Sequence, residues 1–155
     1  MINNGRNDIP LYSTVAGAHM SHFRLREFEN SDGFAMVHPS VLLSLENTRL
    51  DLCMDAKEEV CILITSAVRT GAENAKLAES LGWTDEGGRV SRNSKHLDKY
   101  GGIAVDIVAF AKSNHRLITQ RTLGAVCRRH FSYVNDKYSD GHVHADNRGE
   151  LLDNA

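Results

Sequence analysis

Two nearly unbroken apolar runs of strand length constrain the fold of this sequence more than any other feature. Residues 59–66 read EVCILITS, and residues 102–108 read GIAVDIV. Short apolar runs bounded by polar or glycine-containing segments are typical of buried strands. We therefore expect both segments inside a sheet. Asp106 is the only charged residue of the second run, so a carboxylate is expected within the buried strand.

Three helices are predicted around these strands. Pro39 suits the first position of a helix because its φ angle is already fixed, and apolar residues at helical spacing follow it over about 39–52. Residues 72–81 are rich in Ala, Leu and Glu and end at Gly82, which is a common helix stop. A third helix is expected over 119–130.

The remaining segments carry weaker signals. Residues 1–20 show no clear period and are interpreted as an irregular arm. A short amphipathic stretch, HFRLREF over 22–28, precedes the turn-like sequence NSDG. Residues 83–101 contain several glycines and many polar side chains, which predicts a long loop of the kind that often serves function.

Two short strands, 131–138 and 142–146, are expected near the end of the chain, joined by a turn. Strands and helices are mixed without a repeated βαβ order, which favours a single α+β domain with a small antiparallel sheet flanked by helices. The expected organisation is an N-terminal arm over 1–21, a domain over 22–148 and a frayed tail over 149–155.

Composition excludes several classes of function. The 155 residues carry a formal charge of −2, so no general basic field is available for nucleic acid. No stretch approaches the ~18 apolar residues that span a bilayer, and the N-terminus lacks the pattern of a secretory signal. Three unevenly spaced cysteines favour reduced thiols over a disulfide framework. We expect a monomer made in a cytoplasm, without nucleic-acid partners or membrane insertion.

A set of His and Asp residues predicts a metal site. His96 lies in the long loop, Asp106 lies in the second apolar run, and His142 and His144 form an HVH pair on one face of a strand. Taken singly, each has a plainer interpretation: a solvated loop residue, a salt-bridged carboxylate or a polar edge strand. Together, His96, Asp106 and His144 match a catalytic zinc site with three protein ligands and an open position.

The sequence resembles the M15 family of zinc D-Ala-D-Ala carboxypeptidases and phage endolysin-type peptidases, which share a fold with the Hedgehog signalling domain. The family signature S-x-H followed by G-x-A-x-D appears as 94–96 and 102–106. A late H-x-H strand appears at 142–144, and an S-x-x-R-T turn appears at 66–70. The resemblance covers about residues 22–148.

The resemblance implies a role for each site residue. One Zn²⁺ per chain would be held by His96, Asp106 and His144, with Ser94 and Asp146 supporting these ligands. Arg69 would stabilise the developing oxyanion or bind a substrate carboxylate.

The chain departs from the family pattern in two places. The loop from His96 to Asp106 is three residues longer than the commonest form, and Gly141 stands where many members carry an acidic general base. His142 is the first candidate for that base and Asp140 the second.

The implied activity is hydrolysis of peptide bonds in peptidoglycan stem peptides, at either D-Ala-D-Ala or L-Ala-D-Glu. The small size fits a phage lysin, a virion-associated enzyme or a cytoplasmic bacterial enzyme. The alternative function is a non-catalytic, zinc-stabilised binding or virion-structural module of the same fold.

Overall fold

A computed structural model describes residues 7–13 and 19–151 of the chain. This part is a small single-domain α+β protein with two antiparallel sheets and three α-helices. In chain order the elements are β1 (Pro10–Ser13), β2 (His19–Arg24), α1 (Pro39–Ala56), β3 (Val60–Ser66), α2 (Gly71–Leu81), β4 (Ala104–Ala111), α3 (Gln120–Cys127), β5 (Tyr133–Asn135) and β6 (Val143–Asp146).

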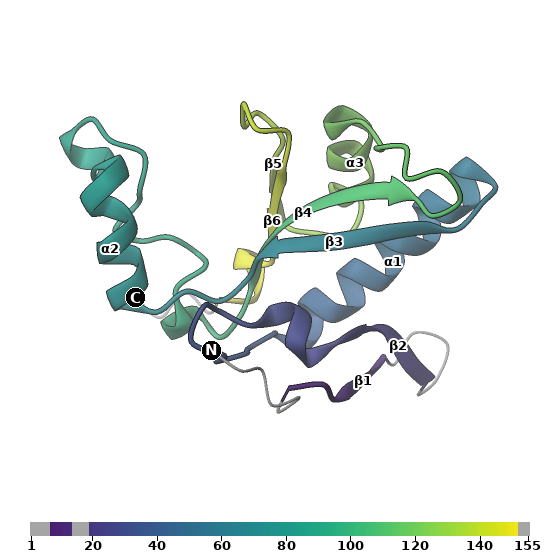
Figure 1. Ribbon diagram of the computed structural model, residues 1–155, viewed down its shortest axis with the longest axis horizontal. Coiled ribbons are helices and arrows are strands. Elements are labelled where there is room, and N and C mark those ends of the chain that lie inside the picture. The colour runs from purple at the N-terminus through teal and green to yellow at the C-terminus, as the bar shows by residue number, and fades with distance from the viewer. Residues whose placement is uncertain (1–6, 14–18, 152–155) are drawn as a thin grey trace.

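The main sheet has the strand order β3-β4-β6-β5, and every neighbouring pair is antiparallel. Strand β4 lies between β3 and β6, as expected for an apolar run (Figure 1). The register places Asp106 of β4 directly opposite His144 of β6. This pairing brings together two site residues that are far apart in sequence.

Helices α1 and α3 pack against each other and against this sheet (Figure 1). The core between them contains Leu45 of α1, Leu123 of α3, Ile107 of β4 and Val143 of β6, all at most 1% exposed. Helix α2 lies away from this core, at the other end of the molecule. The long loop after α2 returns the chain to the start of β4.

Most of the predicted elements are present, with shifted ends. Helix α1 continues to Ala56, beyond the expected end at residue 52, and Lys57 terminates it with a φ of 56°. Strand β4 begins at Ala104, two residues later than the apolar run. Gly102 has a φ of +77°, and a Cβ there would lie 2.9 Å from the backbone of Met36, so this position favours glycine. The third helix and the two late strands are shorter than expected.

The expectation of an irregular arm over residues 1–20 is wrong for the described part. Strands β1 and β2 form an antiparallel pair that contacts α1, and β2 runs across the boundary expected after residue 21. The amphipathic stretch 22–28 is the end of β2 followed by a 3₁₀ turn, in which Phe28 is fully buried. Expectations for residues 1–6, 14–18 and 152–155 lie outside the described residues.

Among the described residues, no helix is both long and apolar enough to cross a membrane. The three cysteines are unpaired, and Cys127 is buried in the core, where burial raises the pKa of its thiol to about 12.

Candidate metal centre

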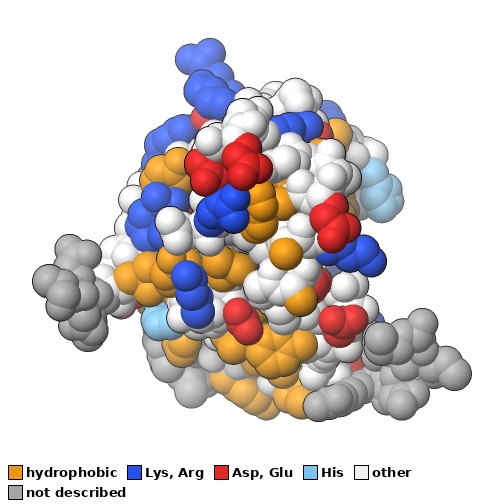
Figure 2. All heavy atoms as spheres, turned by 90° about the vertical axis from the view of Figure 1, so that its left-hand side faces the viewer, with side chains coloured by type: hydrophobic (Ala, Val, Ile, Leu, Met, Phe, Trp, Pro, Cys, Tyr) orange, Lys and Arg blue, Asp and Glu red, His pale blue; other side chains and the backbone are white. Residues whose placement is uncertain are grey.

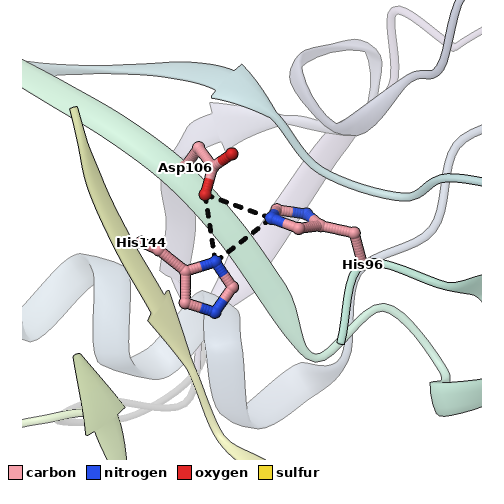
Figure 3. Close-up of side chains that lie close together, drawn as sticks. All are labelled: His96, Asp106 and His144. Atoms are coloured by element: carbon pink, nitrogen blue, oxygen red, sulfur yellow. Dashed lines mark hydrogen bonds and ion pairs between the residues drawn. The ribbon is translucent and has the colours of Figure 1, made fainter. Parts of the chain in front are cut away.

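His96, Asp106 and His144 converge at one end of the main sheet (Figure 3). Oδ1 of Asp106 lies 3.1 Å from Nε2 of His96 and 3.0 Å from Nδ1 of His144. The two ring nitrogens are 3.2 Å apart. Both imidazoles are buried, with 5% of His96 and 7% of His144 exposed. Three potential ligand atoms thus meet in a protected position and could hold a metal ion.

The long loop places His96 by hydrogen bonds to the segment after β3. The backbone N–H of Arg69 donates to the carbonyl of His96 at 2.8 Å, and Asp98 donates back to the carbonyl of Arg69 at 2.9 Å. Oγ of Ser94 accepts from the backbone N–H of His96 at 3.3 Å. Two backbone hydrogen bonds to Arg69 therefore fix the position of the loop around His96.

Partners outside the cluster decide which ring nitrogens carry hydrogen. Nδ1 of His96 lies 2.7 Å from the carbonyl oxygen of Ala67, which can only accept a hydrogen bond. Nε2 of His144 lies 2.7 Å from Oδ2 of Asp146. Because both outer nitrogens donate, the inner nitrogens of neutral rings present lone pairs toward the carboxylate of Asp106. Three acceptors facing one another require a cation or a proton between them.

The electrostatics of the cluster agree with this requirement. Burial alone would raise the pKa of Asp106, but hydrogen bonds from His144 and His96 outweigh it and lower that pKa. Burial alone would lower the pKa of His144, whereas its bonds to Asp106 and Asp146 raise it to about 8. A lowered pKa for Asp106 and a raised pKa for His144 are the directions expected where the surroundings favour positive charge beside this carboxylate.

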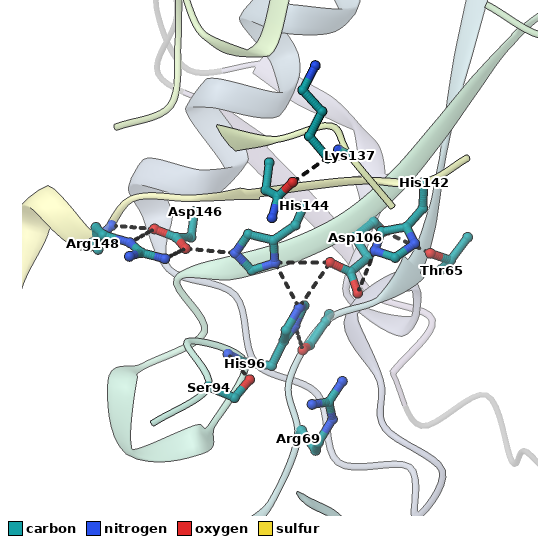
Figure 4. Close-up of polar contacts among 12 residues, drawn as sticks. Thr65, Arg69, Ser94, His96, Asp106, Lys137, His142, His144, Asp146 and Arg148 are labelled. Atoms are coloured by element: carbon teal, nitrogen blue, oxygen red, sulfur yellow. Dashed lines mark hydrogen bonds and ion pairs between the residues drawn. The ribbon is translucent and has the colours of Figure 1, made fainter. Parts of the chain in front are cut away.

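Asp146 and Arg148 continue the row of polar residues that begins at His142 (Figure 4). The pKa of Asp146 falls to about 2, because hydrogen bonds from His144 and Arg148 outweigh the effect of burial. Arg148 also lies over the ring of Tyr133, 3.5 Å from its centroid. We did not predict a role for Arg148 or Tyr133. Arg148 lies beyond the end of β6, in the 3₁₀ turn Arg148–Glu150, so the two-residue period that relates His144 to Asp146 does not extend to it.

His142 and Asp140 lie beside the cluster and contact each other. Oδ1 of Asp140 accepts from the backbone N–H of His142 at 3.1 Å and lies 2.5 Å from its Nδ1. Nε2 of His142 is directed toward Asp106, 3.7 Å from Oδ2 (Figure 4). The ring of Tyr138 stacks on His142 with the centroids 4.1 Å apart. The two candidates for a general base are therefore neighbours in one hydrogen-bonded pair.

A pocket of about 530 Å³ opens onto the three candidate metal ligands, and Arg69, Arg89 and Lys95 contribute to its wall. Nη1 of Arg69 donates to Oδ1 of Asn74 at 3.1 Å. None of these three cations forms an ion pair with a carboxylate of the described residues within 4.0 Å. On the side of the molecule that carries α2, basic side chains lie beside hydrophobic ones (Figure 2).

A second hollow, of about 740 Å³, lies beside β2 and β3 and contains none of the predicted site residues. The pocket at the convergent His and Asp side chains is therefore the candidate functional site.

Comparison with protein-family models found no match for this chain, and comparison with curated proteins found none either.

Proposed function

We propose that this protein is a zinc-dependent peptidase that holds one Zn²⁺ through Nε2 of His96, Oδ1 of Asp106 and Nδ1 of His144. The observation that carries the proposal is the convergence of three lone-pair atoms, from two buried imidazoles and the partly buried carboxylate of Asp106. Partners outside the cluster set the tautomers of the two rings. Two imidazoles and one carboxylate form a ligand set that catalytic Zn²⁺ sites use, and three protein ligands with an open fourth position are typical of such a site.

The bound ion would polarise the scissile carbonyl and acidify the attacking water. The chain itself supplies the proton carrier. Asp140 holds Nδ1–H of His142, so Nε2 of the neutral ring is free to accept a proton on the side of the metal ligands. His142 takes the proton of the attacking water and delivers it to the leaving amine, and Asp140 orients the ring.

Arg69, Arg89 and Lys95 suit a peptide substrate that carries a carboxylate. They line the same pocket as the metal ligands, and their charges add to the positive charge of the ion. Arg69 is half-buried and held by Asn74, so its guanidinium is positioned to bind a substrate carboxylate or a developing oxyanion.

The proposed substrates are the stem peptides of peptidoglycan, and the proposed fold is that of the Hedgehog/DD-peptidase group. Support comes from the resemblance to M15 peptidases, whose S-x-H, G-x-A-x-D and H-x-H motifs here carry the three convergent residues. The three additional loop residues form a 3₁₀ turn over Asp98–Tyr100, after the ligand His96, so the insertion leaves the ligand set together.

Hydrolysis of purified peptidoglycan tests this function. We expect release of new amino groups by the zinc-loaded protein, loss of release in a chelator and recovery when zinc is restored. Mass spectrometry of the fragments identifies the bond that is cut. Normal hydrolysis by metal-free protein would contradict the proposal.

The alternative function, a non-catalytic module stabilised by zinc, is favoured by one observation. Gly141, at the position of the family's acidic base, has a φ of +89°, which an L-residue such as Glu or Asp rarely adopts. A protein that binds zinc and gains stability from it, yet cleaves no peptidoglycan, would support this alternative.

A further inference from the structure

The carboxylate of Asp146 is fully buried and has four hydrogen-bond donors (Figure 4). Its Oδ1 accepts from the backbone N–H of Arg148 at 3.0 Å and from Nε of Arg148 at 2.9 Å. Its Oδ2 accepts from Nη2 of Arg148 at 2.8 Å and from Nε2 of His144 at 2.7 Å. Arg148 thus makes three of the four bonds that determine where this carboxylate lies.

Arg148 is itself held in place. It follows β6 at the start of the 3₁₀ turn Arg148–Glu150, and its guanidinium covers the ring of Tyr133 at 3.5 Å. The ring of Tyr133 also meets His144 edge-on, with the centroids 6.0 Å apart. The guanidinium is therefore confined between the carboxylate and an aromatic ring that borders the same histidine.

We propose that Arg148 is a positioning residue of the metal centre. Through Asp146 it holds the imidazole of His144 with Nε2–H directed outward and the lone pair of Nδ1 directed toward Asp106. This role rests on the proposed metal site, but not on peptidase activity. Hydrogen-bond partners of metal ligands commonly change metal affinity by ~10–100-fold when they are removed.

The chain contains a matched control for this proposal. Arg128 also makes a two-point contact with a buried carboxylate, although through its two Nη atoms: Nη1 lies 3.0 Å from Oδ2 and Nη2 lies 2.9 Å from Oδ1 of Asp136. Asp136 is 7% exposed and makes no contact with His96, Asp106 or His144 in the described structure. Loss of either arginine removes an equivalent ion pair, but only Arg148 is connected to a metal ligand.

The test measures the Kd for Zn²⁺ of the full chain by competition with a chelator, together with the Tm of the zinc-free protein. We expect Arg148→Met to raise the Kd by ~10–100-fold. Arg128→Met should leave it within about twofold, because no ligand depends on Asp136. Arg148→Lys should give a smaller increase, because Lys keeps the charge but not the two-point contact.

A double substitution separates positioning from a general loss of stability. If Arg148 acts through Asp146, Arg148→Met should raise the Kd little further in an Asp146→Asn protein. Equal increases for Arg148→Met and Arg128→Met, or no increase for Arg148→Met, would overturn the proposal and leave the proposed peptidase intact. If Arg148→Met does not fold, a wild-type Kd in Arg148→Lys would overturn it. A wild-type protein without zinc affinity would overturn the metal site as well.

Discussion

At the scale of single residues, the candidate metal centre depends on which nitrogen of each imidazole carries hydrogen. His96 donates to the carbonyl of Ala67 and His144 donates to Asp146, so both rings turn lone pairs inward. The contacts of His142 follow the same principle, because Asp140 takes its Nδ1–H and leaves Nε2 on the side of Asp106. In each of the three rings, one nitrogen hydrogen-bonds to a protein acceptor. The other nitrogen keeps a lone pair on the side of Asp106.

His142→Ala should retain zinc but lose peptidase activity by ~10²-fold or more, the usual size of a general acid–base contribution. Zinc analysis checks that the variant retains the metal, and the rate of cleavage of a stem peptide checks the loss of activity. Asp140→Ala should be milder, because Asp140 only orients the ring. An inactive Asp140→Ala beside an active His142→Ala would reverse the two roles, and two active variants would place the base elsewhere.

Arg69→Ala should remove most of the activity and little of the stability. Among the described residues, the side chain of Arg69 makes a single hydrogen bond, to Asn74, whose loss is worth about 1 kcal/mol, or a few degrees in Tm. The bonds that place His96 involve the backbone of Arg69 and survive the substitution. A large fall in Tm with normal activity would show that Arg69 is structural.

At the scale of elements, the N-terminal strand pair is attached to α1 by one buried carboxylate. Glu46 of α1 accepts from the backbone N–H of His22 at 2.8 Å and lies 2.8 Å from Nδ1 of His22. It also accepts from the hydroxyl of Ser21. Burial alone would raise the pKa of Glu46, but these bonds outweigh it and hold that pKa below its ordinary value.

Glu46→Gln should therefore destabilise the protein by about 1–3 kcal/mol at pH 7, the usual worth of hydrogen bonds to a charged group. A lowered folded-state pKa means that the carboxylate stabilises the fold above its ordinary pKa of 4.5, and that this contribution is lost as the pH falls further. Urea unfolding at pH 7 and at about pH 3 measures the free energy of unfolding of both proteins. The difference between the wild-type protein and Glu46→Gln should be smaller at the lower pH. Glu79→Gln, at an exposed position of α2, is the control.

At the scale of the whole molecule, a metal ion would join three separate parts of the chain: the long loop, β4 and β6. Only the folded chain brings these ligands together, so binding should add directly to the free energy of unfolding. The loop is the part that depends most on such a link, because among the described residues it contributes only short 3₁₀ turns and no strand of the sheet.

Zinc at a thousand times its Kd should stabilise the protein by about 4 kcal/mol, which corresponds to a rise in Tm of about 8–16 °C. Differential scanning calorimetry with zinc and with a chelator measures the shift. His96→Ala should abolish this zinc-dependent rise in Tm, because only two of the three proposed ligands remain. The same zinc-dependent shift in His96→Ala would show that the ion binds elsewhere.

The sequence by itself determined the features that depend on local geometry. The apolar runs predicted β3 and β4, and Gly82 predicted the end of α2, because strand and helix periods follow from the backbone alone. The alternation of His142, His144 and Asp146 likewise follows from the period of a strand. The sequence therefore predicted the types of the three candidate ligands and the segments that carry them.

Only the tertiary structure decided how these parts meet. The register of β4 against β6 places Asp106 opposite His144, and the bonds between the Arg69 segment and the loop bring in His96. The tautomers, the Asp140–His142 pair and the contacts of Arg148 with Asp146 depend on partners that local patterns do not specify. The N-terminal strands were missed for the same reason: their polar sequence has no clear period, and contacts with Glu46 of a distant helix hold them in place. Register and long-range hydrogen bonds are properties of the folded chain, whereas periodicity is a property of each segment.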